Sequence, residues 1–163
     1  MPLEIRADDL SGPEIRALVA AHLANSAHYS PPHAIHALSA DGMRAPGVAI
    51  WSAWENGALV GMGGLKALPT GDGDGEGKGK GEGEIKAMHT AAAHRGKGVA
   101  EAMLHHLTAE ARRRGYRRLW LETGVQDGYA ASRRLYMRHG FVACGPFADY
   151  AGNPYSVFMT LAL

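Results

Sequence analysis

The residues best suited to chemistry lie in a glycine-containing segment from His94 to Ala100. An apolar run before it is typical of a strand, and apolar residues after it recur at helical spacing. That helical stripe comprises Val99, Ala100, Met103, Leu104, Leu107 and Ala111. The glycines therefore lie at a strand-to-helix turn, where backbone N–H groups and the helix dipole favour a phosphate. Gly96 and Gly98 lack Cβ atoms and allow close approach to the main chain, and Arg95 and Lys97 add positive charge.

Two common phosphate loops are excluded. The chain has no G-x-x-x-x-G-K-[ST], and it has no G-x-G-x-x-G with an acidic residue about 20 positions further on. The pattern that remains, Arg95-x-x-Gly98-x-Ala100, resembles the acyl-CoA pyrophosphate loop of the GNAT superfamily of N-acetyltransferases. The alternative is a glycine-rich helix start that binds nothing.

A second motif follows in the order that this superfamily shows. After a strand at 119–123, a helix from Tyr129 to His139 ends in Leu135-Tyr136-x-x-x-Gly140-Phe141, which resembles the family's L-Y-x-x-x-G-F signature. Gly140 suits the left-handed residue that ends many helices. The resemblance covers residues 48–163 well and residues 1–47 only in general layout.

The resemblance implies that acetyl-CoA is the co-substrate. Its pyrophosphate would be held by Arg95, Gly96, Lys97, Gly98, Val99 and Ala100. The pantetheine would pair with main-chain groups of Met88, His89 and Thr90. A main-chain N–H, that of Met88, would donate to the thioester carbonyl, as in other acyl-transfer sites.

Tyr136 stands where the family keeps a tyrosine near the CoA sulfur, so the resemblance implies that it protonates the departing thiolate. The alternative is a tyrosine that only caps the core. Many family members carry Asn where Tyr129 stands and Ala where Ser132 stands. Ser132 could replace part of the missing contact to pantetheine.

The general base has two acidic candidates. Glu84 is the first, because it opens the strand that resembles the family's catalytic-glutamate strand, and Glu122 on the next strand is the second. Either carboxylate could take a proton from an ammonium through one or two waters, or each could be a solvated glutamate at a strand end. His89 is a further candidate because its ordinary pKa is near neutral, but in a regular strand it points away from the Met88 side.

These elements predict an α/β fold of the GNAT type, in the order β-α-α-β-β-β-α-β-α-β-β, with a mixed, mostly antiparallel sheet flanked by helices. The strands on either side of the cofactor-loop helix should run parallel. Asn56-Gly57 predicts a hairpin turn. The closing strands are expected at Phe141–Phe147 and Tyr155–Leu161.

Residues 71–83 alternate Gly with Asp, Glu or Lys and contain no apolar residue. Such a segment cannot contribute to a core, so a flexible hairpin insertion is expected. Asp72-x-Asp74-x-Glu76 resembles a calcium loop faintly, but the spacing and closing glutamate of that motif are missing. No metal site is expected, because His33 and His36 lack a third ligand at suitable spacing.

Composition limits the alternatives. The 163 residues suit one domain, and a net charge of +1 argues against a nucleic-acid-binding surface. The arginines at 112–118 are interpreted as a solvated helix end. One cysteine excludes an internal disulfide and suits the cytoplasm, and neither a signal peptide nor a membrane span is evident.

Two functions from different classes remain. The first is an acetyl-CoA-dependent N-acetyltransferase that acts by direct transfer on a primary amine of a small molecule or peptide. The second is a non-catalytic acyl-CoA-binding sensor or interaction module. A homodimer is compatible with either.

Overall fold

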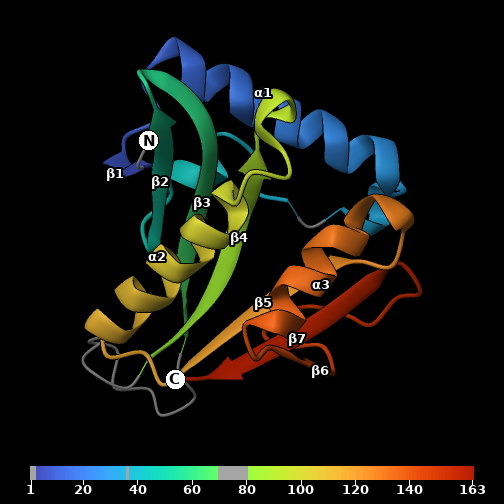
Figure 1. The fold of residues 1–163 in the computed structure, drawn as a ribbon. Helices are drawn as coiled ribbons and strands as arrows, with labels where there is room; N and C mark the ends of the chain where they lie inside the picture. Colours follow the sequence, from blue (N-terminus) through green and yellow to red (C-terminus); the bar gives the residue numbers. More distant parts are fainter. Residues whose placement is uncertain (1–2, 36, 70–80) are drawn as a thin grey trace.

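The computed structural model describes residues 3–35, 37–69 and 81–163. Its elements, in chain order, are β1 (Glu4–Asp8), α1 (Pro13–Tyr29), β2 (Val48–Glu55), β3 (Ala58–Leu68), β4 (Glu82–Thr90), α2 (Val99–Arg113), β5 (Arg118–Gly124), α3 (Ala130–Arg138), β6 (Val142–Cys144) and β7 (Ser156–Ala162). The strands form one sheet in the order β1-β2-β3-β4-β5-β7-β6 (Figure 1). The predicted α/β arrangement with a mostly antiparallel sheet is confirmed.

The sheet divides between β4 and β5, which is the one parallel pair of its described strands. Their register runs from Glu82 opposite Arg118 to Glu84 opposite Trp120 and ends there. Beyond Glu84 the two strands diverge, as Figure 1 shows from the lower end of the sheet upward. The edge of β4 from Ile85 to Thr90 therefore has no strand beside it on the β5 side.

A bulge accompanies this divergence. In the β3–β4 register, Met62 pairs with His89 and Gly64 with Lys86, so two residues of β4 stand opposite Gly63. One of the two, Ala87, has a φ of 56°, a left-handed conformation that is rare for alanine. The extra residue bends the strand and shifts which side chains share a face.

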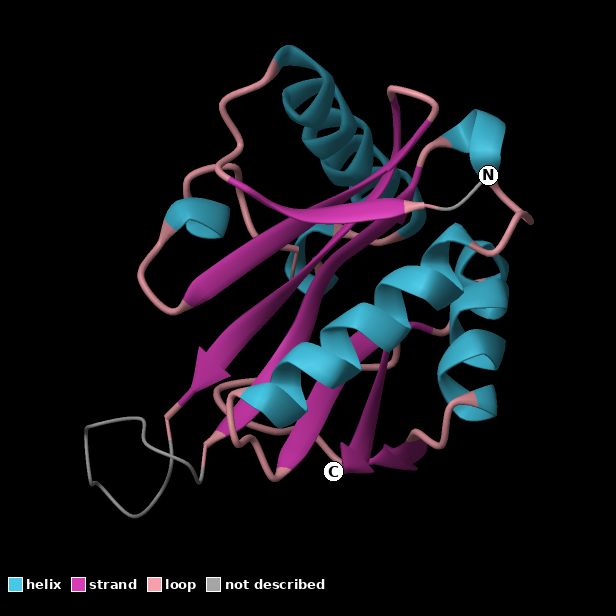
Figure 2. Ribbon diagram, turned by 60° about the vertical axis from the view of Figure 1, so that its left-hand side comes forward, coloured by secondary structure: helices cyan, strands magenta, loops and turns pink. Residues whose placement is uncertain are grey.

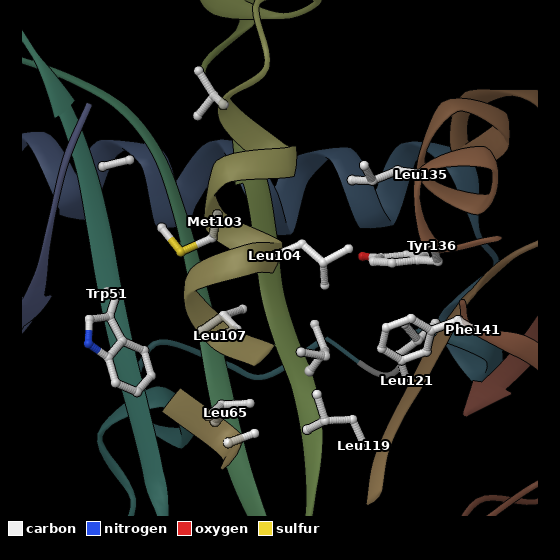
Figure 3. Close-up of a cluster of buried hydrophobic side chains, with 14 of the residues drawn as sticks. Trp51, Leu65, Met103, Leu104, Leu107, Leu119, Leu121, Leu135, Tyr136 and Phe141 are labelled. Atoms are coloured by element: carbon white, nitrogen blue, oxygen red, sulfur yellow. The ribbon is translucent and has the colours of Figure 1, made fainter. Parts of the chain in front are cut away.

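Helices cover the two faces of the sheet, with α1 on one side and α2 and α3 on the other (Figure 2). Most of the apolar stripe of α2 is buried as predicted: Val99, Met103, Leu104, Leu107 and Ala111 are at most 2% exposed, whereas Ala100 is only partly buried. They pack on β3, β4 and β5, as the close-up shows (Figure 3). The substitution Leu107→Ala would cost roughly 2–5 kcal/mol of stability, as it does for other buried leucines.

The glycines of β3 allow α2 to lie close to the sheet. A Cβ atom on Gly63 would lie 2.6 Å from Met103 Cγ, and one on Gly61 would lie 2.7 Å from Val99 Cγ1. These strand glycines therefore make space for the helix that follows the phosphate loop.

Several local predictions are confirmed, and three need correction. The Asn56-Gly57 turn joins β2 to β3 with positive φ at both residues, and Gly140 has a φ of 93° just after α3.

The first correction concerns the second helix predicted before β2, which is replaced by two 3₁₀ turns at Pro32–Ala34 and Gly42–Arg44. Pro31 and Pro32 lack the N–H groups that would continue a helix.

The other two corrections concern strand ends. The strand expected at 141–147 spans only Val142–Cys144, because Gly145-Pro146 follows it. The insertion expected at 71–83 ends earlier, because Glu82 and Gly83 pair with Leu68 and Ala67 in the β3–β4 hairpin. Residues 70–80 lie outside the described part of the chain.

Within the described ranges, no helix is both long and apolar enough to cross a membrane.

Candidate active site

A cavity of about 610 Å³ occupies the space where β4 and β5 diverge. Both strands line it, through residues 85–90 and 121–124. The turn at the start of α2, helix α3 and the C-terminal half of α1 complete its wall. The cavity thus joins the elements in which the sequence analysis placed the cofactor and the catalytic groups.

The expected phosphate loop forms one part of this wall. Arg95, Gly96, Gly98, Val99 and Ala100 line the cavity, whereas Lys97 is exposed and lies outside the lining. Gly96 and Gly98 have φ values of 77° and 85°, which a residue with a side chain rarely adopts.

The space around the loop suits a bulky anion. A Cβ atom on Gly96 or Gly98 would meet no other atom within 4 Å. Helix α2 begins directly after Gly98, so the N–H groups of its first turn have no partner within the helix. These free donors and the open space in front of them fit a diphosphate.

The pantetheine segment expected at Met88, His89 and Thr90 also lines the cavity. All three residues are half-buried on the part of β4 that has left β5. Main-chain groups on this edge are available to a ligand lying along the strand. The bulge at Ala87 turns the Met88 side chain toward α2, where it packs against the main core.

Tyr136 lies in the wall formed by α3. The side chain is 6% exposed, its ring packs against Phe141, and its hydroxyl points toward Leu104 (Figure 3). Burial raises the pKa of Tyr136 above its usual value, and the nearby Glu122 carboxylate raises it further. The phenol hydroxyl therefore keeps its proton at neutral pH.

Ser132 lies one turn before Tyr136 on α3 and also lines the cavity. Tyr129 lines it as well, and its ring contacts Tyr29 from α1 with the centroids 5.5 Å apart. The position at which the family carries asparagine is thus filled by an aromatic contact across the cavity.

Glu122 is the acidic candidate that reaches the cavity. Burial raises its pKa to about 7, and the Ser156 hydroxyl and then the positive charge of Lys86 partly oppose that rise. A carboxyl group with a pKa near neutral is suited to accept and to release a proton at physiological pH.

Glu84, the other acidic candidate, has a different environment. The side chain is 2% exposed, lies outside the cavity lining and forms an ion pair with Lys86 Nζ at 3.0 Å. The Tyr150 hydroxyl donates a hydrogen bond to the same carboxylate, and Lys86 Nζ donates to the Tyr150 oxygen at 2.6 Å. The geometry assigns Glu84 to a buried network with Lys86 and Tyr150, and of these three residues Lys86 lines the cavity.

A histidine pair that the sequence analysis missed lies in the same cavity. His22 of α1 and His89 of β4 have their Nδ1 atoms 3.2 Å apart. Burial lowers the pKa of His22 to about 4, and burial also lowers the pKa of His89. Both rings are therefore neutral at pH 7, and one Nδ1 donates its proton to the other.

Comparison with known proteins agrees with this arrangement. Residues 16–141 match the acetyltransferase (GNAT) family. The chain is 45% identical to "Uncharacterized N-acetyltransferase YsnE" of Bacillus subtilis (strain 168) over 161 residues, which cover 99% of this chain and 100% of that protein. It is 42% identical to "Uncharacterized N-acetyltransferase YedL" of Escherichia coli (strain K12), with coverages of 98% and 94%.

A solved structure shares the fold. A GNAT family acetyltransferase from Elizabethkingia anophelis with acetyl-CoA bound superimposes with a TM-score of 0.66 at 17% identity, and the match covers 99% of this chain and 98% of that one. Fold, site geometry and relatives agree, and the chain belongs to the acetyltransferase (GNAT) family, whose members are acyltransferases.

Proposed function

We propose that this protein transfers an acetyl group from acetyl-CoA to a primary amine of a small molecule or peptide, by direct attack of the amine on the thioester. The observation that carries the proposal is the single cavity at the divergence of β4 and β5. It brings together a helix start that fits a phosphate, a strand edge with no neighbour on the β5 side, a carboxyl group with a pKa of about 7 and a phenol with a raised pKa. The structural relative with bound acetyl-CoA supports the choice of co-substrate.

The cofactor would lie across the start of α2. Its pyrophosphate would accept hydrogen bonds from the first-turn N–H groups behind Gly96 and Gly98, with Arg95 supplying charge. Its pantetheine arm would lie between the β4 edge at Met88–Thr90 and α3 at Ser132. In this pose the thioester would lie near the Tyr136 side chain.

Glu122 is the base that we propose. Its ionised carboxylate would accept a proton from the ammonium, directly or through water, and so produce the neutral amine that attacks the thioester carbon. We assign this role to Glu122 rather than Glu84, because Glu122 lines the cavity and Glu84 is bound to Lys86 and Tyr150.

The remaining steps would use a main-chain donor and Tyr136. The N–H of Met88 would stabilise the negative charge that develops on the carbonyl oxygen as the C–N bond forms. When the C–S bond breaks, Tyr136 would give its proton to the sulfur and then recover one from the amide nitrogen or solvent. The products are an N-acetylated amine and free CoA.

The test is acetyl-CoA-dependent thiol release with a panel of small amines and peptides. The expected result is thiol release that requires one class of amine, with an equal amount of acetylated product measured by mass spectrometry. Tight acetyl-CoA binding without amine-dependent thiol release would instead show the non-catalytic acyl-CoA-binding module.

A further inference from the structure

Three side chains with metal-binding chemistry meet at the edge of the cofactor cavity, which one of them, Glu101, also lines. Glu101 and His105 stand one turn apart on α2, and His139 follows the last residue of α3. One donor atom from each lies within 4.8 Å of the other two. The Glu101 Oε1 and His139 Nε2 atoms are 3.6 Å apart, and the two imidazole rings meet edge to face with centroids 4.7 Å apart.

The His139 nitrogen is the atom that the local hydrogen bonding leaves unexplained. Its Nε2 atom is shielded from solvent and has no hydrogen-bond partner in the described part of the structure. The 3.6 Å separation from the Glu101 carboxylate is longer than a hydrogen bond. A buried polar atom without a partner is costly, and a ligand bound to it would remove that cost.

We propose that Glu101, His105 and His139 form a binding site for a divalent transition metal ion of the Zn²⁺ class. Two imidazoles and one carboxylate match the ligands of such ions and not those of Mg²⁺ or Ca²⁺, which take oxygen ligands. Tetrahedral Zn²⁺ with bonds of about 2 Å needs ligand atoms about 3.3 Å apart. The 3.6 Å pair nearly meets this spacing already, and a change of side-chain torsion in the exposed Glu101 and His105 would bring in the third atom.

The charges around the site allow a cation to bind. The C-terminal end of α3, where His139 lies, carries the negative end of the helix dipole. Arg138 competes for the carboxylate, with Nη2 3.4 Å from Glu101 Oε2, but its side chain is 61% exposed and can turn into solvent. Three protein ligands would leave the fourth position to water.

The site would connect two elements that the reaction uses. Helix α2 begins at the phosphate loop, and α3 carries Tyr136. A metal ion bound between Glu101 and His139 would tie the first turn of α2 to the end of α3. It would stabilise the folded cavity without sharing a ligand with Glu122 or Tyr136.

The test is metal binding to the tag-free, chelator-treated protein. Titration calorimetry with ZnCl₂ should show one saturable site per chain, and CoCl₂ should give the visible absorption of tetrahedral cobalt. His139→Gln and His105→Gln should each weaken Zn²⁺ binding at least tenfold and abolish that absorption. The matched control is His28→Gln, an exposed histidine of α1 outside the cluster, which should bind Zn²⁺ like the wild type.

A thermal readout keeps the proposal independent of activity. Zn²⁺ should raise the unfolding midpoint of the wild type and of His28→Gln, but not that of His105→Gln, whose exposed side chain can change without loss of fold. Equal Zn²⁺ affinity in the wild type and both cluster variants, or no saturable binding at all, would overturn the site. The cluster would then be only an ion pair between two helix ends.

Discussion

The Nζ atom of Lys86 lies 3.0 Å from the Glu84 carboxylate, two residues away on β4, and both side chains are at least nine-tenths buried. Tyr150, from the segment between β6 and β7, hydrogen bonds to both. This relationship favours Glu122 over Glu84 as the base, which reverses the order that the sequence analysis gave to the two acidic candidates. Glu84 holds Lys86 in place, while Lys86 faces the cavity in which Glu122 lies.

Glu84→Gln should therefore affect stability more than chemistry. Removing one partner from a buried ion pair typically costs roughly 3–5 kcal/mol, because the other charge stays buried. The thermal midpoint should fall, while the folded fraction should turn over within a few fold of the wild-type rate. Turnover reduced a hundredfold in a variant with unchanged stability would make Glu84 the base instead.

Glu122→Gln should have the opposite effect. We expect turnover to fall roughly 10²–10⁴-fold, as for loss of a general base. In the wild type, kcat/KM should rise with pH through about 7 as the Glu122 carboxyl loses its proton. This inflection should be missing from the profile of the variant, measured with an acceptor from the amine panel.

Stability provides the control for that assignment. Because burial raises the folded-state pKa of Glu122 to about 7, from an ordinary 4.5, its stabilising contribution is complete below 4.5 and is lost as the pH rises through 7. As the pH rises from 4.5 to 8, the thermal unfolding midpoint of the wild type should therefore fall relative to that of Glu122→Gln. A constant difference would show that the pKa of Glu122 is not raised.

Tyr136→Phe keeps the packing against Phe141 and removes the proton donor. Acetyl-CoA binding should survive, and turnover should fall on the order of a hundredfold. Since burial raises the pKa of this phenol, the loss should be similar across the usual assay range. The matched control, Tyr129→Phe, changes another tyrosine of the cavity wall and should retain turnover. Wild-type rates in Tyr136→Phe would make the tyrosine structural.

Local patterns predicted the parts of the site that lie close together in the chain. Residue type and spacing were enough to predict the apolar stripe of α2, the glycines before it and the end of α3 at Gly140. Each of these features depends on residues within one or two helical turns of one another. The parallel pairing of β4 and β5 was also predicted, and the register shows that it ends at Glu84.

Contacts between distant segments could not be predicted in this way. His22 and His89 are 67 residues apart and meet only because α1 crosses the bulged strand. Tyr150 reaches Glu84 across 66 residues, and no periodicity links them. Glu101 and His105 show helical spacing, but His139 joins them only through the packing of α3 beside α2.

The central claim, that acetyl-CoA binds in the cleft at the start of α2, is tested most directly by calorimetric titration of acetyl-CoA into Gly98→Asp and Gly98→Asn. Asp and Asn have the same shape, and both would adopt the left-handed backbone conformation of Gly98. The comparison of the two variants therefore isolates the effect of one negative charge facing the pyrophosphate. We expect one site per chain in the wild type and an affinity for Gly98→Asp at least tenfold weaker than for Gly98→Asn, about 1.4 kcal/mol. Equal affinities for two folded variants would contradict the placement of the pyrophosphate at this loop.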